Sequence, residues 1–70
     1  METQEQRYQK GIELLKSEKY DQALKIFDQL IKEFPTEADY WSERGVVYFH
    51  LKDKASSLFD MDKAVELQPK

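Results

Sequence analysis

The sequence predicts an all-α fold of four helices, arranged as two copies of one helix-turn-helix unit. The same interval of 34 residues separates four pairs of identical residues, which are Gly11 and Gly45, Leu24 and Leu58, Asp28 and Asp62, and Pro35 and Pro69. Between them, apolar residues recur at steps of three and four, the spacing of one face of an α-helix. A fixed period of this length is typical of stacked helical repeats, in which each unit covers the apolar face of its neighbour.

The first unit contains two predicted helices. The first begins near Thr3, and its apolar side chains on one side are Tyr8, Ile12 and Leu15. Gly11 lies in the middle of this helix at a cost of about 1 kcal/mol relative to alanine, which indicates that another helix approaches closely there. The second runs from Tyr20 to Phe34 with a continuous apolar stripe, and Pro35 ends it because a residue before proline avoids the helical conformation.

The second unit repeats this plan. Thr36 is followed three residues later by Asp39, a pattern that predicts Thr36 as the N-cap of a third helix extending to about Leu51. Asp53 is a predicted cap for a fourth helix, which Pro69 closes. The apolar residues of this last helix are Leu58, Met61, Ala64, Val65 and Leu67.

Composition restricts the function classes. Seventy residues form one small domain, and the absence of cysteine excludes disulfides and thiolate zinc sites as its reinforcement. Eleven basic and fourteen acidic residues are interspersed, with no basic stripe for a nucleic acid. No apolar stretch approaches the roughly 20 residues of a membrane span, and the first residues lack the apolar core of a secretory signal. We therefore expect a cytoplasmic protein without nucleic-acid or membrane partners.

The sequence offers no catalytic, cofactor or metal site. No nucleophile stands beside a base, no glycine-rich phosphate loop is present, and the carboxylates are expected on solvated helix faces. His50, the only histidine, precedes Asp53 by three residues but has no further metal ligand. The helical spacing of Trp41, Tyr48 and Tyr20 indicates packing rather than stacking on a base or cofactor. We expect a protein that is not an enzyme.

Taken in register, the two units resemble the tetratricopeptide repeat family. The matching positions are Gly11, Tyr20, Ala23, Leu24, Phe27 and Pro35 in the first unit, and Trp41, Gly45, Tyr48, Ala64 and Pro69 in the second. The resemblance implies two antiparallel helix pairs stacked as a short right-handed α-solenoid with a concave groove. It also implies a single domain over residues 1–70, with repeat one at about 4–37 and repeat two at about 38–70.

The groove is where the resemblance places a partner, namely a peptide or helix of another protein. Its candidate contact residues are Tyr8, Ile12, Leu15, Ser42, Val46, Phe49 and His50, and the flanking groove positions are Glu5, Lys16 and Asp39. The alternative for the apolar members is packing between the helix pairs. Exposed aromatic residues in a groove are typical binding anchors, which makes Phe49 and Tyr8 the foremost candidates.

One ligand chemistry of the family is not expected here. Members that hold the C-terminal carboxylate of heat-shock chaperones use lysine and asparagine in the groove, and the matching positions of this chain are Tyr8, Ile12 and Glu43. These side chains offer a carboxylate neither a cation nor an amide, and Glu43 would repel it. The sequence therefore predicts a groove without this carboxylate clamp.

The last helix has no successor to cover its apolar residues. Leu58 and Val65 are equivalent to Leu24 and Ile31 of the first unit, and the full set of self-association candidates is Leu58, Phe59, Met61 and Val65. Two explanations compete. Either the chain forms a homodimer or other homo-oligomer through this helix, or it is the N-terminal part of a longer protein whose next repeat covers the face.

Overall fold

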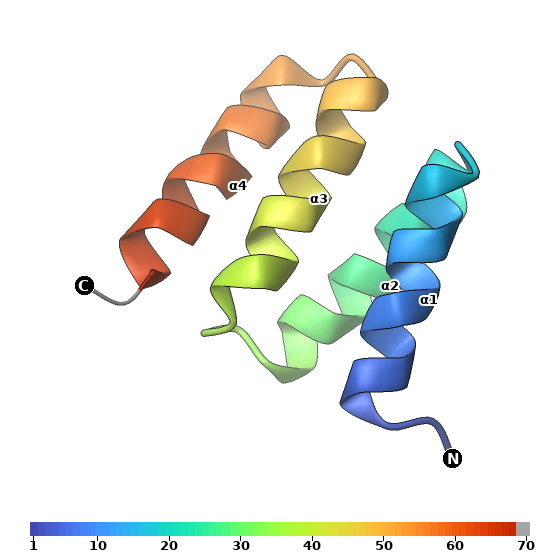
Figure 1. Cartoon of the computed structure of the whole chain (residues 1–70). Helices are drawn as coiled ribbons and strands as arrows, with labels where there is room; N and C mark the ends of the chain where they lie inside the picture. The colour runs from blue at the N-terminus through green and yellow to red at the C-terminus, as the bar shows by residue number, and fades with distance from the viewer. Residues whose placement is uncertain (69–70) are drawn as a thin grey trace.

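The chain folds into two antiparallel helix pairs, as a computed structural model describing residues 1–68 shows (Figure 1). In chain order the helices are α1 (Gln4–Lys16), α2 (Tyr20–Glu33), α3 (Ala38–His50) and α4 (Lys54–Leu67). The all-α prediction and the four helices are thereby confirmed, and no strand occurs among the described residues. The predicted closure of the second unit at Pro69 lies outside them. None of the described helices is long and apolar enough to cross a membrane.

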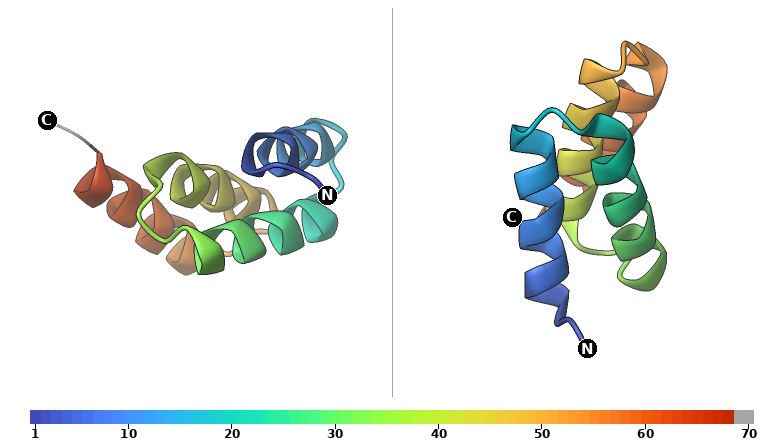
Figure 2. Two further views of the ribbon diagram at one scale, coloured as in Figure 1. Left: turned by 90° about the horizontal axis from the view of Figure 1, so that it is seen from below. Right: turned by 90° about the vertical axis from the view of Figure 1, so that its right-hand side faces the viewer.

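The two pairs stack through α2 and α3. Helix α3 packs on α4 within its own pair and on α2 of the first pair, whereas α1 and α3 touch at few points. Figure 2 shows α1 and α3 on the same side of the stack. The buried apolar core lies mainly on α2 and α3 and consists of Ala23, Phe27, Leu30, Ile31, Tyr40 and Val47.

Helix starts agree with the sequence in two of three cases. The Thr3 hydroxyl accepts from the backbone N–H of Gln6 at 3.1 Å, and the Asp53 carboxylate accepts from that of Ser56 at 3.1 Å. The prediction that Thr36 caps α3 is wrong, because Glu37 occupies the cap position without a side-chain hydrogen bond. The indole N–H of Trp41 donates to the Pro35 carbonyl at 2.8 Å. This bond ties the interunit turn to α3, and the helix begins too late for Thr36 to reach its first N–H groups.

The turns inside the two pairs have the same geometry. Glu18 and Lys52 lie 34 residues apart, and both adopt a left-handed backbone, with φ of 62° and 67°. In each turn the following N–H reaches back to a carbonyl in the preceding helix, from Lys19 to Leu14 at 2.9 Å and from Asp53 to Tyr48 at 3.0 Å. These bonds satisfy carbonyl groups at the helix end, as in other left-handed helix terminations.

Each helix pair closes over a glycine. A Cβ added at Gly11 would lie 2.8 Å from Cζ of Phe27, and one added at Gly45 would lie 3.1 Å from Cε of Met61. Phe27 and Met61 are themselves 34 residues apart, so the close approach is part of the repeated unit. The prediction that these glycines admit a neighbouring helix is supported at both positions.

The two pairs are also joined by one arginine. Arg44 donates from Nε and Nη2 to the carboxylate of Asp60 at 2.8 and 2.9 Å, and from Nη1 to Asp28 at 3.0 Å. It therefore links α3 to α4 and α2. Asp60 is only 1% exposed, which corrects the expectation that the carboxylates lie on solvated faces. These charged hydrogen bonds, Asp60 first, raise the pKa of Arg44 although burial acts to lower it.

The aromatic residues of α3 complete the surroundings of Arg44. Its guanidinium carbon lies 5.0 Å from the ring centre of Trp41 and 5.7 Å from that of Tyr48. Both rings are half-buried. A guanidinium over an aromatic face is attracted by the ring quadrupole, so these contacts add to the ion pairs. This arrangement supports the prediction that Trp41 and Tyr48 serve packing.

The two glycines yield a matched prediction. We expect Gly11→Ala to lower the free energy of unfolding by about 1 kcal/mol, because the clash with the buried Phe27 ring exceeds the helical gain of about 1 kcal/mol. Gly45→Ala should be neutral or stabilising by up to about 1 kcal/mol, because the flexible end of Met61 can move aside. Urea unfolding followed by circular dichroism measures both changes. Equal effects at the two positions would contradict this account.

Candidate functional site

The α1–α3 face is organised around Tyr8. Its ring centre lies 5.4 Å from that of Tyr40 on α3 and 6.2 Å from that of Phe27 on α2. Its hydroxyl donates to the Glu43 carboxylate at 3.1 Å, and Gln4 donates to the Tyr40 hydroxyl at 2.7 Å. Tyr8 is half-buried by these contacts. It thus joins the two pairs while keeping part of its surface accessible.

Electrostatics around Tyr8 are negative. Its pKa is raised well above the ordinary value of 10.0, first by burial and then by the charge and hydrogen bond of Glu43. Asp39 and Glu5 act in the same direction. All three carboxylates disfavour a phenolate at this position. The face around Tyr8 therefore has a negative potential, which favours a cation over an anion.

The far end of this face carries three aromatic rings. His50 at the end of α3 stacks on Tyr20 at the start of α2, with ring centres 4.7 Å apart and planes 4° apart. Phe49 meets the same imidazole edge-on, with ring centres 5.8 Å apart. Phe49 is 61% exposed. A large apolar ring is thus held near a rigid stack while most of its surface contacts solvent.

The remaining groove candidates divide between two places. Ile12 and Leu15 are half-buried and pack against the core from α1, and Val46 on α3 is also half-buried. Ser42 lies apart from them, in a hollow at the α3–α4 end of the molecule. The structure therefore places Ser42 with the surface of the last helix pair.

His50 is not close to the acid that its sequence position suggested. The Asp53 carboxylate is engaged with Ser56, whose N–H and hydroxyl donate to it at 3.1 and 2.7 Å. These hydrogen bonds lower the pKa of Asp53. Among residues 1–68, no group of three or more histidine, cysteine or acidic side chains has the arrangement of a metal site.

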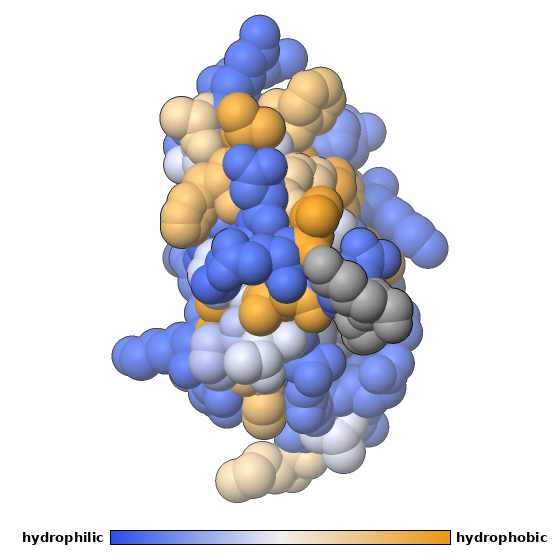
Figure 3. Space-filling model, turned by 90° about the vertical axis from the view of Figure 1, so that its left-hand side faces the viewer, coloured by the Kyte–Doolittle hydropathy of each residue, from blue (hydrophilic) through white to orange (hydrophobic). Residues whose placement is uncertain are grey.

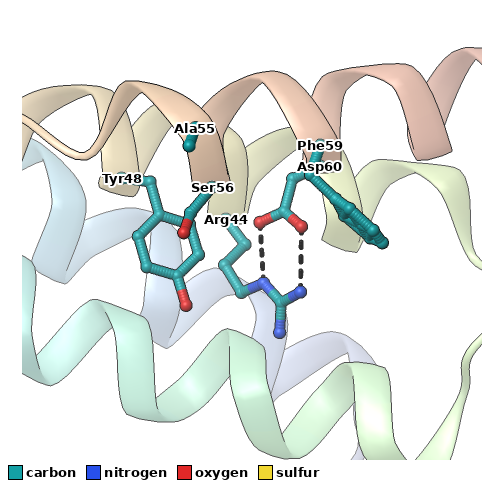
Figure 4. A pocket seen from close by; sticks show the side chains of 6 residues that line it. All are labelled: Arg44, Tyr48, Ala55, Ser56, Phe59 and Asp60. Carbon is teal, nitrogen blue, oxygen red and sulfur yellow. Dashed lines mark hydrogen bonds and ion pairs between the residues drawn. The ribbon is translucent and has the colours of Figure 1, made fainter.

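A hollow of about 330 Å³ lies beside Arg44, as Figure 4 shows. Its lining residues are Arg44, Tyr48, Ala55, Ser56, Phe59 and Asp60. The guanidinium donates to Asp60 and Asp28, and the dashed lines in Figure 4 mark the two bonds to Asp60. Its charge is therefore compensated inside the fold. We assign this cluster to structure rather than to ligand recognition.

Sequence reasoning missed the Arg44 cluster, although a signal was present. Asp60 falls among the inward positions of α4, three residues after Ser57 and four before Ala64. Arg44 likewise falls between Trp41 and Tyr48 at steps of three and four on α3. A charge inside each of two apolar stripes indicates a buried ion pair.

The last helix exposes three of its four self-association candidates. Leu58, Phe59 and Val65 are 65%, 57% and 68% exposed. Figure 3, viewed from the side of α4, shows apolar side chains among the polar ones of this face. Met61 is half-buried and lies against Gly45, in the position that Phe27 has over Gly11. Much of Met61 therefore belongs to the packing between α3 and α4.

Comparisons with known proteins agree on one family. The family profile described as tetratricopeptide repeat matches residues 8–70. Among curated proteins, similar sequences are Hsp70-Hsp90 organizing protein 1 of Glycine max and Hsp70-Hsp90 organizing protein of Triticum aestivum, 38% and 34% identical over 61 residues. Each match covers 87% of this chain but 11% or 10% of the relative. The chain thus spans about a tenth of their length. No solved structure gives a significant match.

The hydroxyl of Tyr8 supplies a test at alkaline pH. Because its pKa is higher in the folded chain than the ordinary value of 10.0, the unfolded chain loses this proton first as the pH rises above 10. Folding stability should then fall with pH in this range, and Tyr8→Phe should remove part of the fall. Urea midpoints at pH 7 to 12 measure it. An identical pH dependence in the variant would contradict the assignment.

Proposed function

Because the chain belongs to the tetratricopeptide repeat family, we propose that it binds a peptide or helix of a partner protein along the α1–α3 face. The exposed ring of Phe49, held against His50, is the observation that carries this proposal. An aromatic side chain that is already positioned loses little conformational freedom on binding, which is typical of an anchor residue. The accessible parts of Tyr8, Ile12, Leu15 and Val46 extend the same face.

The charge of the face indicates the kind of partner. Glu5, Asp39 and Glu43 all raise the pKa of Tyr8, so they act together at one place. A lysine or arginine of the partner would be attracted there, and its apolar neighbours would contact Phe49. We therefore propose a partner segment in which apolar and basic residues alternate within a few positions.

The relatives are named for Hsp70 and Hsp90, but the groove argues against one way of binding them. At the positions that would hold a terminal carboxylate, Ile12 packs on the core and Glu43 accepts the Tyr8 hydroxyl. A carboxylate there would face another carboxylate without a cation between them. We propose that this chain does not bind chaperone C-terminal carboxylates in this manner.

Selection from a random peptide library tests the proposal. We expect the immobilised chain to enrich peptides with an apolar residue near lysine or arginine, and Phe49→Ala to weaken the best peptide about tenfold with unchanged helicity. Phe59→Ala is the matched control, because Phe59 is 57% exposed but lies on α4. Fluorescence polarisation gives the affinities. A selected peptide that binds Phe49→Ala as tightly as the parent, or depends on Phe59 instead, would refute the groove assignment.

A second candidate function is self-association through the last helix, favoured by the exposure of Leu58, Phe59 and Val65. Burying side chains of this size contributes about 1.5–3 kcal/mol each. On this hypothesis the chain sediments as a dimer at micromolar concentration, and Leu58→Glu converts it to a helical monomer. A parent chain that sediments as a monomer would eliminate this candidate.

A further inference from the structure

An open hollow lies at the free end of the stack, between α3 and α4. It holds about 340 Å³ and is lined by Ala38, Asp39, Ser42, Met61, Ala64, Val65 and Gln68. It is separate from the proposed groove residues Tyr8, Ile12 and Phe49. Its occupant can be deduced from the first helix pair, because the two pairs are copies of one unit.

In the first pair, the corresponding position is filled by α3. Residues 34 positions before Ala38, Ser42 and Met61 are Gln4, Tyr8 and Phe27. Gln4 bonds the hydroxyl of Tyr40, and Tyr8 stacks on the Tyr40 ring. Tyr40 is only 6% exposed as a result. The hollow of the second pair is thus the place where a following helix would insert an aromatic ring.

The second pair leaves more room than the first. At four lining positions, a smaller or more flexible side chain replaces a larger or rigid one, namely Ala38 for Gln4, Ser42 for Tyr8, Met61 for Phe27 and Ala64 for Leu30. Tyr40 fills the narrower site in the first pair. The wider site in the second pair therefore suits a bulky aromatic residue.

Charge at the rim specifies a second feature of the occupant. In the first pair, Asp28 of α2 accepts from Arg44 of α3 at 3.0 Å. Its equivalent on α4 is Asp62, which is exposed. Arg44 follows Tyr40 by one helical turn, and the buried Val47 follows Arg44 by three residues. A complementary helix would carry the same three features in the same order.

From this correspondence we infer that the α3–α4 end surface binds an amphipathic helix of a partner that carries an aromatic residue, a basic residue four positions later and an aliphatic residue three positions after that. The aromatic ring enters the hollow beside Ser42 and Ala64. The basic group pairs with Asp62, and the aliphatic residue covers Leu58. This surface is additional to the proposed groove.

A second copy of the chain fits this surface poorly when stacked head to tail. The α1 residues equivalent to Tyr40, Glu43, Arg44 and Val47 are Gln6, Gln9, Lys10 and Glu13, and all four are exposed. Such a contact would place Gln6 in the hollow and Glu13 against apolar side chains. Burial of these polar groups without partners is unfavourable.

A two-fold pairing of α4 with its own copy is also unfavourable. Centred between Leu58 and Val65, an antiparallel contact of this kind brings Asp62 close to the same residue of the other copy. Two carboxylates would then approach each other at the middle of the interface, where like charges are most destabilising. A partner helix with a basic residue removes this repulsion.

The test uses a probe taken from the chain itself. A synthetic peptide of residues 37–51 contains Tyr40, Arg44 and Val47, and a cross-link between positions 45 and 49 on its opposite side holds it helical. Titrated into the ¹⁵N-labelled 70-residue chain, it should shift amide signals of Ser42, Ala64 and Val65. Val65→Glu should weaken binding about tenfold, whereas Phe49→Ala in the groove should leave it unchanged.

A charge exchange makes the test specific. Asp62→Lys should weaken the peptide about tenfold, and a peptide carrying Arg44→Glu should bind this variant better than it binds the parent chain. Absence of binding at about 1 mM peptide, or an Asp62→Lys effect that the exchanged peptide does not reverse, overturns the inference. A parent dimer that Val65→Glu dissociates overturns it as well, because a second copy is then the occupant. Loss of groove binding in Phe49→Ala leaves these outcomes unaffected.

Discussion

The ion pair between Arg44 and Asp60 is the interaction on which the second helix pair and its junction with the first depend. Asp60 is almost fully buried, and both of its oxygens accept from one guanidinium. Removing either partner would leave an uncompensated charge in the interior, a loss of about 3–5 kcal/mol in comparable pairs. Because Arg44 also binds Asp28 on α2, the same side chain sets how the second pair sits on the first. Trp41 and Tyr48 flank the guanidinium and fix its position.

This division of labour leaves different faces of α3 for different tasks. Residues on the Arg44 side are occupied by ion pairs and packing, and Tyr40 and Val47 are buried against the first pair. Phe49 and His50, near the end of the helix, remain exposed. The proposed groove therefore uses a part of α3 that the fold does not need for its stability. Tyr8 differs, because its ring and hydroxyl also hold the two pairs together.

The helices were predictable because their apolar stripes and the 34-residue period depend only on local spacing. The close approaches at Gly11 and Gly45 were predictable for the same reason. The start of α3 was not, since the Trp41–Pro35 hydrogen bond, and not Thr36, organises the turn before it. The burial of Asp60 was missed because it depends on an arginine 16 residues away on another helix. The positions of Ser42 and Met61 follow from the register of the repeat, which comparison with Tyr8 and Phe27 reveals.

The two ends of the stack are chemically unequal, and this inequality gives the molecule a direction. At the α1 end, the positions that would contact a preceding unit carry Gln6, Gln9, Lys10 and Glu13, so water covers that surface without loss. At the α4 end, the equivalents of residues that pack against α3 are Leu58 and Val65, which are largely exposed. Internal repetition alone would have made the two ends complementary. Since the first end departs from the repeat and the second retains it, a helix can be added favourably only on α4.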